Sequence, residues 1–388
     1  MIKYDFDKTV DRKNTNCVKH DLTSLFFGCT DLLPMWIADM DIAIPDFICE
    51  AVKNRAEHPV YGYSFFGESY YANFIHWMYK RHGLKIEKEW ICFSPGVVPA
   101  LNMSVLTFSK PNDKVVIQPP VYPPFFNAVS DHDRQLTQNH LRLEGTAYAM
   151  DFDDLESQID ANTSMLILCN PHNPIGRAWT EKELLTLVGI CEKNNICLVS
   201  DEIHSDFIRP PHKHNSLLSL TDKTIACFSP SKTFNLAGMS TSMIVIPDQT
   251  LREKYLHTLN GLHIAFGNLF GSIATEAAYG QGEEWYKQLW DYLQANIDYV
   301  VQFCKANIPQ IKVMPSDASY LLWLDCRGLS ANGEKLQEIF TENLKLGLNN
   351  GSEFGKNGEG FMRMNVACPR KTLEEAMQRL RCLANFIA

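Results

Sequence analysis

The sequence predicts an α/β protein in which a mainly parallel sheet is flanked by helices, together with a smaller α+β domain. Short, almost wholly apolar runs recur through the middle of the chain, as is typical of strands that are buried on both faces. Segments with helical periodicity separate these runs. After about residue 265 the pattern changes to long amphipathic stretches around a few further strands.

The main sheet is expected to contain five strands, one for each apolar run. The runs are Lys114–Gln118, Ser164–Cys169, Ile196–Ser200, Thr224–Ser229 and Ser242–Ile246. A helix is predicted over Val97–Ser109, where Pro99 lies in the first turn. A second helix is predicted over Thr180–Asn194, because Thr180 and Glu183 have the spacing of a capping box.

The C-terminal third predicts the smaller domain. Amphipathic stretches at residues 268–280, 284–307 and 371–387 indicate helices, and Ser319–Asp325 and Gly360–Val366 indicate strands. We therefore expect a large domain over residues 46–285. Residues 1–45 together with residues 286–388 are expected to form the small domain.

The composition excludes several classes of protein. The chain has 388 residues, of which 45% are hydrophobic and 21% are charged, as in ordinary globular proteins. Its net charge of −9 repels phosphate backbones and argues against a nucleic-acid partner. The chain has no apolar signal core at its start and no apolar run long enough to span a bilayer. We expect no membrane association and a cytoplasmic location.

The twelve cysteines are scattered and include no CxxC pair. Without a secretion signal, reduced thiols are expected rather than disulfides or a zinc site. His212 and His214 lie close together in the sequence but have no third ligand nearby. Two imidazoles alone make a weak metal site, so no metal is predicted.

Lys232 is the most informative residue, because it follows a buried apolar strand in the segment SPSKTFNLAG. Burying an ammonium group is costly unless it is paired or covalently modified. Lysine amines form Schiff bases with carbonyl groups, including that of pyridoxal 5′-phosphate (PLP). Taken alone, however, a lysine after a strand is more often an exposed surface residue.

The residues at two further strand ends favour the Schiff-base role of Lys232 over a surface role. Asp201 follows an apolar strand in SDEIHSD, and a carboxylate there can keep the pyridine nitrogen of PLP protonated. The alternative role of Asp201 is a helix N-cap. The turn Asn170–Gly176 (NPHNPIG) follows a third strand. Because parallel strands end at the same edge of a sheet, Asn, Asp and Lys side chains would meet there.

Two loops complete the candidate site. The turn SPGVV leads into a helix whose free N–H groups and dipole can hold a phosphate group. In PPVYPPF, Tyr122 is fixed between prolines, so its ring is either part of a rigid surface turn or stacked on a planar cofactor. The helix start lacks a GxGxxG motif, so nothing here favours a dinucleotide.

Together these motifs resemble the fold-type I PLP enzymes of the class I/II aminotransferase superfamily. The sequence is most similar to the MalY/PatB-type cystathionine β-lyase (C–S lyase) branch, and the resemblance covers nearly the whole chain. It is carried by PMWIADMD, YGY, SPGVVPA, PPVYPPF, NPHNPIG, SDEIHSD, SPSKTFNLAG, SYLLWLD and FMRMNVACPR. The resemblance implies an aspartate aminotransferase-like fold and PLP as the cofactor.

The resemblance also implies roles for residues around the cofactor ring. Lys232 would form the Schiff base and move protons, and Asp201 would pair with the ring nitrogen. Asn173 would donate a hydrogen bond to the phenolic oxygen, with His204 nearby, where many relatives have tyrosine. Tyr122 would stack on the ring.

Further residues are implied for the phosphate group. The backbone of Gly96, Val97 and Val98 and the hydroxyl group of Ser229 would bind it. Tyr61 is similar to a tyrosine that reaches the phosphate of the neighbouring subunit. This similarity implies a homodimer with sites at its interface.

The implied activity is the cleavage of L-cystathionine or related S-substituted L-cysteines to a thiol, pyruvate and ammonia. Arg363 would bind the α-carboxylate of this small-molecule substrate, although an arginine there is otherwise more often part of a surface ion pair. Aminotransferases commonly have a phosphate-binding arginine at the position of Ser240, and its absence favours a lyase. An aminotransferase is the alternative enzyme, and a non-catalytic ligand-binding or regulatory relative is a third possibility.

The preferred thioether is not evident from the sequence. Three segments are candidates to contact the substrate beyond its sulfur atom: Met35–Asp41, Phe65–Phe66 and residues 261–267.

Overall fold

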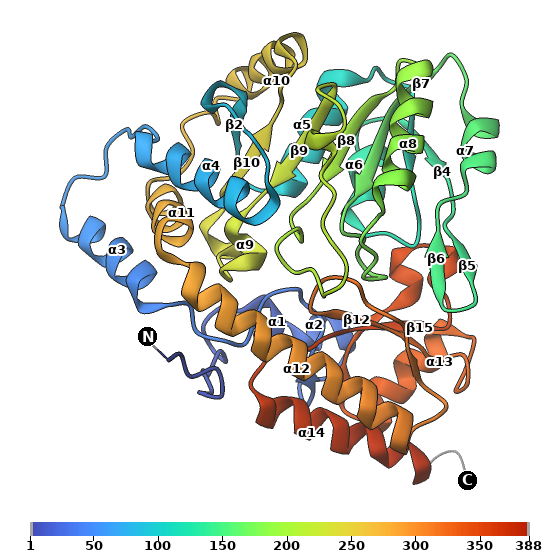
Figure 1. The fold of residues 1–388 in the computed structure, drawn as a ribbon. Helices are drawn as coiled ribbons and strands as arrows, with labels where there is room; N and C mark the ends of the chain where they lie inside the picture. Colours follow the sequence, from blue (N-terminus) through green and yellow to red (C-terminus); the bar gives the residue numbers. More distant parts are fainter. Residues whose placement is uncertain (1–2, 386–388) are drawn as a thin grey trace.

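A seven-stranded sheet forms the centre of the computed structural model, which describes residues 3–385 (Figure 1). The strand order is β2-β10-β9-β8-β7-β3-β4. The strands are Ile91–Ser94 (β2), Lys114–Ile117 (β3), Gln135–Gln138 (β4), Thr163–Cys169 (β7), Cys197–Asp201 (β8), Thr224–Phe228 (β9) and Ser242–Val245 (β10). All five strands predicted from apolar runs are present, and each end lies within one residue of its expected position.

The sheet is mainly parallel, as predicted. Strands β4, β3, β7, β8 and β9 run in one direction, whereas β10 is antiparallel to both of its neighbours, β9 and β2. The carboxyl ends of the parallel strands therefore lie at a single edge. This is the edge at which open α/β sheets bind their ligands.

Helices cover both faces of the sheet (Figure 1). On one face lie α5 (Val97–Phe108), α6 (Pro124–Ser130) and α10 (Gln249–Gly261), and on the other lies α8 (Glu181–Lys193). Val115 and Ile117 of β3 pack into the cluster with α5, whereas Val116 packs into the cluster with α8. Successive strand residues point to opposite faces, so a strand covered on both sides has to be apolar throughout.

The capping box predicted for α8 is present. Thr180 Oγ1 accepts a hydrogen bond from the Glu183 amide at 3.3 Å, and Glu183 Oε2 accepts one from the Thr180 amide at 2.8 Å. Helix α5 begins differently, because its N-cap residue is Gly96 and no side chain caps it. The uncapped start of α5 faces the sheet edge described below.

The C-terminal part contains α11 (Leu269–Gln281), α12 (Glu283–Asn307) and α14 (Arg370–Arg381). A four-stranded antiparallel sheet has the order β11-β12-β15-β14, with strands Lys312–Val313, Leu321–Asp325, Phe361–Asn365 and Asn349–Asn350. Strand β1 (Leu33–Pro34) pairs with β13 (Leu346–Gly347), so the N-terminal segment joins this part. The expected boundary between residues 285 and 286 falls inside α12, and the division into two domains stays a prediction.

One predicted helix is too long. The stretch 371–387 was expected to be helical, but α14 ends at Arg381 and a 3₁₀ turn follows over Cys382–Asn385. Apolar spacing continues through both kinds of helix, so periodicity alone does not mark where the hydrogen-bond pattern changes. Residues 386–388 of this prediction lie outside the described residues.

The remaining α-helices and strands are shorter or lie at the edges of the fold. They are α1 (Val18–Asp21), α2 (Thr23–Phe27), α3 (Asp46–Glu57), α4 (Glu68–His82), α7 (Phe152–Gln158), α9 (Pro230–Thr233), α13 (Gly333–Glu338), β5 (Arg142–Glu144) and β6 (Ala147–Ala149). Among the described residues, none of these helices or the longer ones is both long and apolar enough to cross a membrane.

Candidate active site

The predicted site residues meet at the carboxyl edge of the sheet. Cys169 is the last residue of β7 and pairs with Asp201, the last residue of β8, which in turn pairs with Cys227 of β9. Beyond these ends lies a cavity of about 180 Å³. It is lined by Ala38, Gly96, Val97, Val98, Pro99, Tyr122, Cys169, Asn173, Asp201, Ile203, His204, Ser231, Lys232 and Ala237.

Lys232 lies in the short helix α9 and points into this cavity with its amine held by hydrogen bonding. Its Nζ atom donates to the carbonyl oxygen of Ala38 at 2.8 Å. Burial lowers the pKa of Lys232 to about 8, and the neighbouring Arg363 acts in the same direction, while Asp39 and Asp201 oppose it. The lowered pKa enlarges the neutral fraction of the amine, which is the form that a nucleophile or base requires.

Asp201 supplies the only carboxylate among the residues that line the cavity. Its Oδ1 atom accepts a hydrogen bond from the Ile203 amide at 3.1 Å. Burial raises the pKa of Asp201 to about 7, although this hydrogen bond and the charge of Lys232 act against the rise. A cation placed beside this carboxyl group would stabilise its ionised form. The protonated nitrogen of a pyridine ring is such a cation.

Arg363 of β15 does not line the cavity itself but bonds to Asn173, which does. Its Nη1 atom donates to Asn173 Oδ1 at 3.0 Å, and its Nη2 atom donates to the Trp36 carbonyl at 2.9 Å and to Asn349 Oδ1 at 2.6 Å. The side chain is only 3% exposed, and its Nε atom has no hydrogen-bond partner within the described residues. A buried guanidinium with an unused donor is suited to bind a carboxylate in its fork.

His204 and Tyr122 border the same space. Burial, together with the charges of Lys232 and Arg363, holds the pKa of His204 well below its usual range, so this imidazole is neutral. Its Nδ1 atom lies 3.5 Å from Ser319 Oγ. Burial also raises the pKa of Tyr122, which keeps the phenol protonated. Both rings therefore present uncharged surfaces to a ligand.

The start of α5 provides an anion site. No side chain caps this helix, and Pro99 has no N–H group, so the free donors of the first turn are the amides of Val97 and Val98. Together with the helix dipole they favour a negatively charged group in front of Gly96. The added Cβ of any other residue at Gly96 would lie 3.2 Å from Pro99 Cδ, a close contact.

The hydroxyl groups near Lys232 are arranged differently from the expectation. Ser229 Oγ donates to the Thr241 carbonyl at 2.8 Å and accepts from the Ser231 amide at 3.2 Å, and Ser229 does not line the cavity. Ser231, which the sequence analysis did not single out, does line it. Its position directly before the lysine in Ser-Pro-Ser-Lys was the available signal. The hydroxyl groups of Ser231 and Ser229 lie 2.8 Å apart, within hydrogen-bonding distance.

Tyr61 lies outside the cavity of its own chain. The side chain is 59% exposed, its hydroxyl donates to the Ala56 carbonyl at 2.6 Å, and its ring packs against Phe270. Phe65 is also exposed, and Phe66 packs against Tyr70 instead of the cavity. Of the three segments expected to contact the far end of the substrate, only Met35–Asp41 reaches the cavity, through Ala38.

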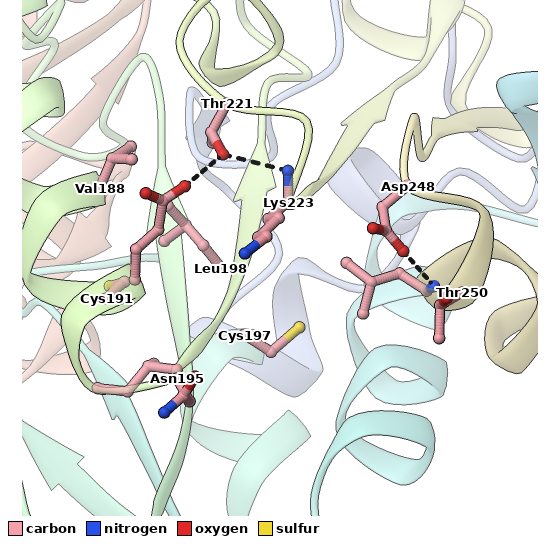
Figure 2. A pocket seen from close by; sticks show the side chains of 12 residues that line it. Val188, Cys191, Asn195, Cys197, Leu198, Thr221, Lys223, Asp248 and Thr250 are labelled. Atoms are coloured by element: carbon pink, nitrogen blue, oxygen red, sulfur yellow. Dashed lines mark hydrogen bonds between the residues drawn. The ribbon is translucent and has the colours of Figure 1, made fainter.

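A second cavity, of about 300 Å³, is separate from this site (Figure 2). Its lining includes Cys191 of α8, Cys197 at the start of β8, and the polar side chains of Lys223 and Asp248. Asp201 ends the same strand, about 13 Å away for four residue steps. The two cavities share no lining residue, so none of the predicted site residues borders the second cavity.

The residues around the first cavity fit PLP. A carboxylate matches the ring nitrogen, the Asn173 amide matches the phenolic oxygen, and an amine matches the aldehyde. Because Asn173 Oδ1 already accepts from Arg363, the Asn173 Nδ2 group is the donor left for an oxygen of the ligand. The uncapped start of α5 and the Ser231 hydroxyl match the phosphate group.

Comparisons with known proteins agree with this fit. Residues 47–380 match the family model of aminotransferase class I and II. Cystathionine β-lyase PatB of Bacillus subtilis is 42% identical over 97% of this chain and 99% of that protein, and protein MalY of Escherichia coli is 31% identical over 97% and 98%. The PLP-bound C–S lyase of Staphylococcus hominis superposes with a TM-score of 0.91 at 32% identity and covers 98% of each chain. The chain therefore belongs to the aminotransferase class I and II family and, within it, to the branch of MalY- and PatB-type C–S lyases.

Proposed function

We propose that this protein is a PLP-dependent carbon–sulfur β-lyase that cleaves L-cystathionine or related S-substituted L-cysteines to a thiol, pyruvate and ammonia. The observation that carries the proposal is the convergence of Lys232, Asp201 and Asn173 on one cavity, with Arg363 bonded to Asn173. A base, a carboxylate for the ring nitrogen and a carboxylate-binding guanidinium are the groups that this elimination needs.

The cofactor would be held by residues at the sheet edge and at the start of α5. Asp201 and Asn173 would bind the ring nitrogen and the phenolic oxygen, and Tyr122 would cover one face of the ring. The amides of Val97 and Val98 and the Ser231 hydroxyl would bind the phosphate. When bound, PLP supplies an electron-accepting ring that is conjugated with the substrate nitrogen.

Arg363 binds the substrate α-carboxylate in this mechanism and so fixes the orientation of Cα. The amine of Lys232 removes the proton from Cα, and the bond between Cβ and sulfur breaks, so that the thiolate leaves with the electron pair. Hydrolysis of the three-carbon product yields pyruvate and ammonia. Holding the base and the Cα–H bond in line is an orientational contribution, which accounts for several kcal/mol of many enzymatic barriers.

An aminotransferase would use the same first proton transfer but would return the proton to the cofactor. This alternative has less support, because the chain has Ser240 instead of the phosphate-binding arginine that is common among aminotransferases, and because the relative at 42% identity is named a cystathionine β-lyase. A non-catalytic relative has still less support, since it would have no need for a buried amine, carboxylate and guanidinium together.

The test is to mix the PLP-loaded protein with L-cystathionine in the absence of any keto acid and to follow pyruvate and free thiol. We expect sustained release of both in equal amounts, and loss of both from Lys232→Ala. A single absorbance shift without turnover, reversed by an added keto acid, would instead identify an aminotransferase. Unchanged elimination by Lys232→Ala would refute the assigned base.

We also propose a homodimer in which Tyr61 reaches the phosphate site of the neighbouring subunit. Four exposed aromatic side chains support it: Tyr61, Tyr63, Phe65 and Phe266. The rings of Tyr63 and Phe266 lie 6.4 Å apart, and clustered exposed apolar groups are typical of interfaces. Sedimentation should give a dimer for the natural protein and a shift toward monomer for Tyr63→Glu. A monomeric natural protein would refute the dimer.

A cytoplasmic location completes the proposal. All twelve cysteines are free thiols in the structure, the state that a reducing compartment maintains. Fractionation of the source cells should recover the protein with the cytosol, and recovery from the medium or an envelope fraction would contradict this.

A further inference from the structure

Residues 36–42, here called the strap, border the cavity through Ala38 and are held by many hydrogen bonds from side chains. Nearly every strap carbonyl accepts one. The donors are Arg363 to Trp36, Asn365 to Ile37 and to Asp39, Tyr320 and Lys232 to Ala38, Asn235 and Arg12 to Met40, and Asn235 to Ile42. Segments without regular structure usually leave such groups to water.

Two of these donors are the groups that would act on the substrate. Arg363 bonds to the carbonyl of Trp36, and Lys232 bonds to the carbonyl of Ala38, two residues later. The Cα atoms of residues two apart are at most about 7 Å from each other. The strap therefore ties the carboxylate-binding group and the base to neighbouring points of one short segment.

The other contacts fix the strap on both sides of Ala38. Asn365 is 1% exposed and donates to the carbonyls of Ile37 at 2.5 Å and of Asp39 at 2.6 Å, so it clamps the residues before and after Ala38. Asn235 donates at 3.0 Å to both Met40 and Ile42 and accepts from the Met40 amide at 3.0 Å.

Ion pairs also anchor the same segment. Arg12 binds Asp39 at 2.5 Å and Asp41 at 2.6 Å, and the buried Lys19 binds Asp41 at 2.7 Å. Asn235 follows Lys232 by three residues, just beyond the end of α9, so this stretch of the chain is attached to the strap at two points. Together these hydrogen bonds and ion pairs fix the position of the Ala38 carbonyl relative to the sheet edge.

We propose that the strap positions the amine of Lys232 for proton transfer at Cα, with Asn365 and Asn235 as positioning residues. The inference rests on the proposed function and deepens it. Lysine has a flexible four-carbon stem, so an amine that is free of the cofactor needs a fixed acceptor to stay in line with the substrate. The Ala38 carbonyl provides that acceptor, and it accepts a hydrogen bond from the ammonium group that forms when Lys232 takes the Cα proton.

The first arm of the test uses the full-length protein with the cofactor removed. Competitive acetylation followed by mass spectrometry measures the reactivity of Lys232 relative to the exposed Lys182. We expect Asn365→Ala to raise the relative labelling of Lys232 about fivefold, since the amine loses a well-placed acceptor. Asn235→Gly should act in the same direction, and glycine adopts the positive φ of 57° at this position without strain.

Asn296→Ala is the matched control. Asn296 is also fully buried and also donates to two main-chain carbonyls, those of Val366 and Cys368, but it makes no hydrogen bond to the strap. It should lower stability in the same way as Asn365→Ala and leave the labelling of Lys232 unchanged.

The second arm uses the PLP-loaded protein and substrate deuterated at Cα. Both strap variants should lower kcat by about 10- to 100-fold and enlarge the deuterium isotope effect, because proton transfer becomes slower relative to other steps. The proposal would be overturned if the folded strap variants showed the same acetylation of Lys232 and the same isotope effect as the natural protein. If Asn365→Ala does not fold, the measurements on Asn235→Gly test the proposal in its place. If the natural protein releases no pyruvate, the proposed function fails, while the labelling arm still tests the strap.

Discussion

Replacing Arg363 with lysine tests the substrate-binding end of the site. The substitution keeps a positive charge but removes the planar fork. In the structure the fork bonds to Asn173, Asn349 and the Trp36 carbonyl, and its Nε atom is buried with no partner among the described residues. A lysine amine would keep one hydrogen bond to a substrate carboxylate where arginine makes two.

The magnitude follows from that loss. A hydrogen bond to a charged group contributes about 1.5–3 kcal/mol, so losing one should lower kcat/KM for L-cystathionine by about 10- to 150-fold. Arg327→Lys is the matched control. Arg327 also forms a forked pair, with Asp325, but its side chain is about half exposed, and such pairs contribute at most about 1 kcal/mol.

The assay compares two ligands, S-methyl-L-cysteine and the same molecule without its carboxylate, 2-(methylthio)ethylamine. Binding is followed by the absorbance of the PLP-loaded protein. We expect Arg363→Lys to weaken binding of the first ligand and to leave the second within about twofold, because only the first has the group that Arg363 binds. Equal weakening of both ligands, or a loss in kcat/KM below about threefold, would refute the assignment.

Three further outcomes are expected. Lys19→Met should lower the free energy of unfolding by about 1.5–3 kcal/mol in urea titrations at pH 7, because Asp41 loses its hydrogen bond to the buried ammonium group and keeps only its pairing with Arg12 and His20. Burial alone would raise the pKa of Asp41, but Lys19 holds that pKa below its usual range. The stabilisation by this pair is therefore present at neutral pH and is lost as the pH falls through the lowered pKa. Equal acid sensitivity of the natural protein and Lys19→Met would contradict this expectation. Thr180→Ala should cost about 1 kcal/mol by removing the cap that pairs with Glu183, and no change in the thermal midpoint would show that the cap is dispensable. In the cofactor-free protein, acetylation of Lys232 should rise with a midpoint near pH 8, and a midpoint near the usual value of lysine would show that burial does not act on it.

Several parts of the molecule follow from local sequence. The apolar runs that became β3, β7, β8, β9 and β10 have to be strands covered on both faces, since an unbroken apolar segment of that length has no side to expose to water. The capping box of α8 needs only two residues three apart. Asp201 and Asn173 could be placed at one edge because parallel strands end together.

The tertiary structure decided the contacts between distant segments. Arg363 meets Asn173 across 190 positions, and Lys232 meets the Ala38 carbonyl across 194. No local period or spacing in the sequence predicts either pairing, because each depends on how β15, α9 and the segments that contain Asn173 and Ala38 pack together in the folded chain. Likewise, Ser231 lines the cavity whereas Ser229 donates to the Thr241 carbonyl, a contact between segments twelve residues apart that the sequence does not indicate.

Sequence alone thus determined which residue types reach the sheet edge, since backbone periodicity and hydrophobic burial act over short distances along the chain. Only the folded chain determined how those side chains are oriented, because hydrogen bonds have strict requirements on distance and angle that are met by segments far apart in sequence.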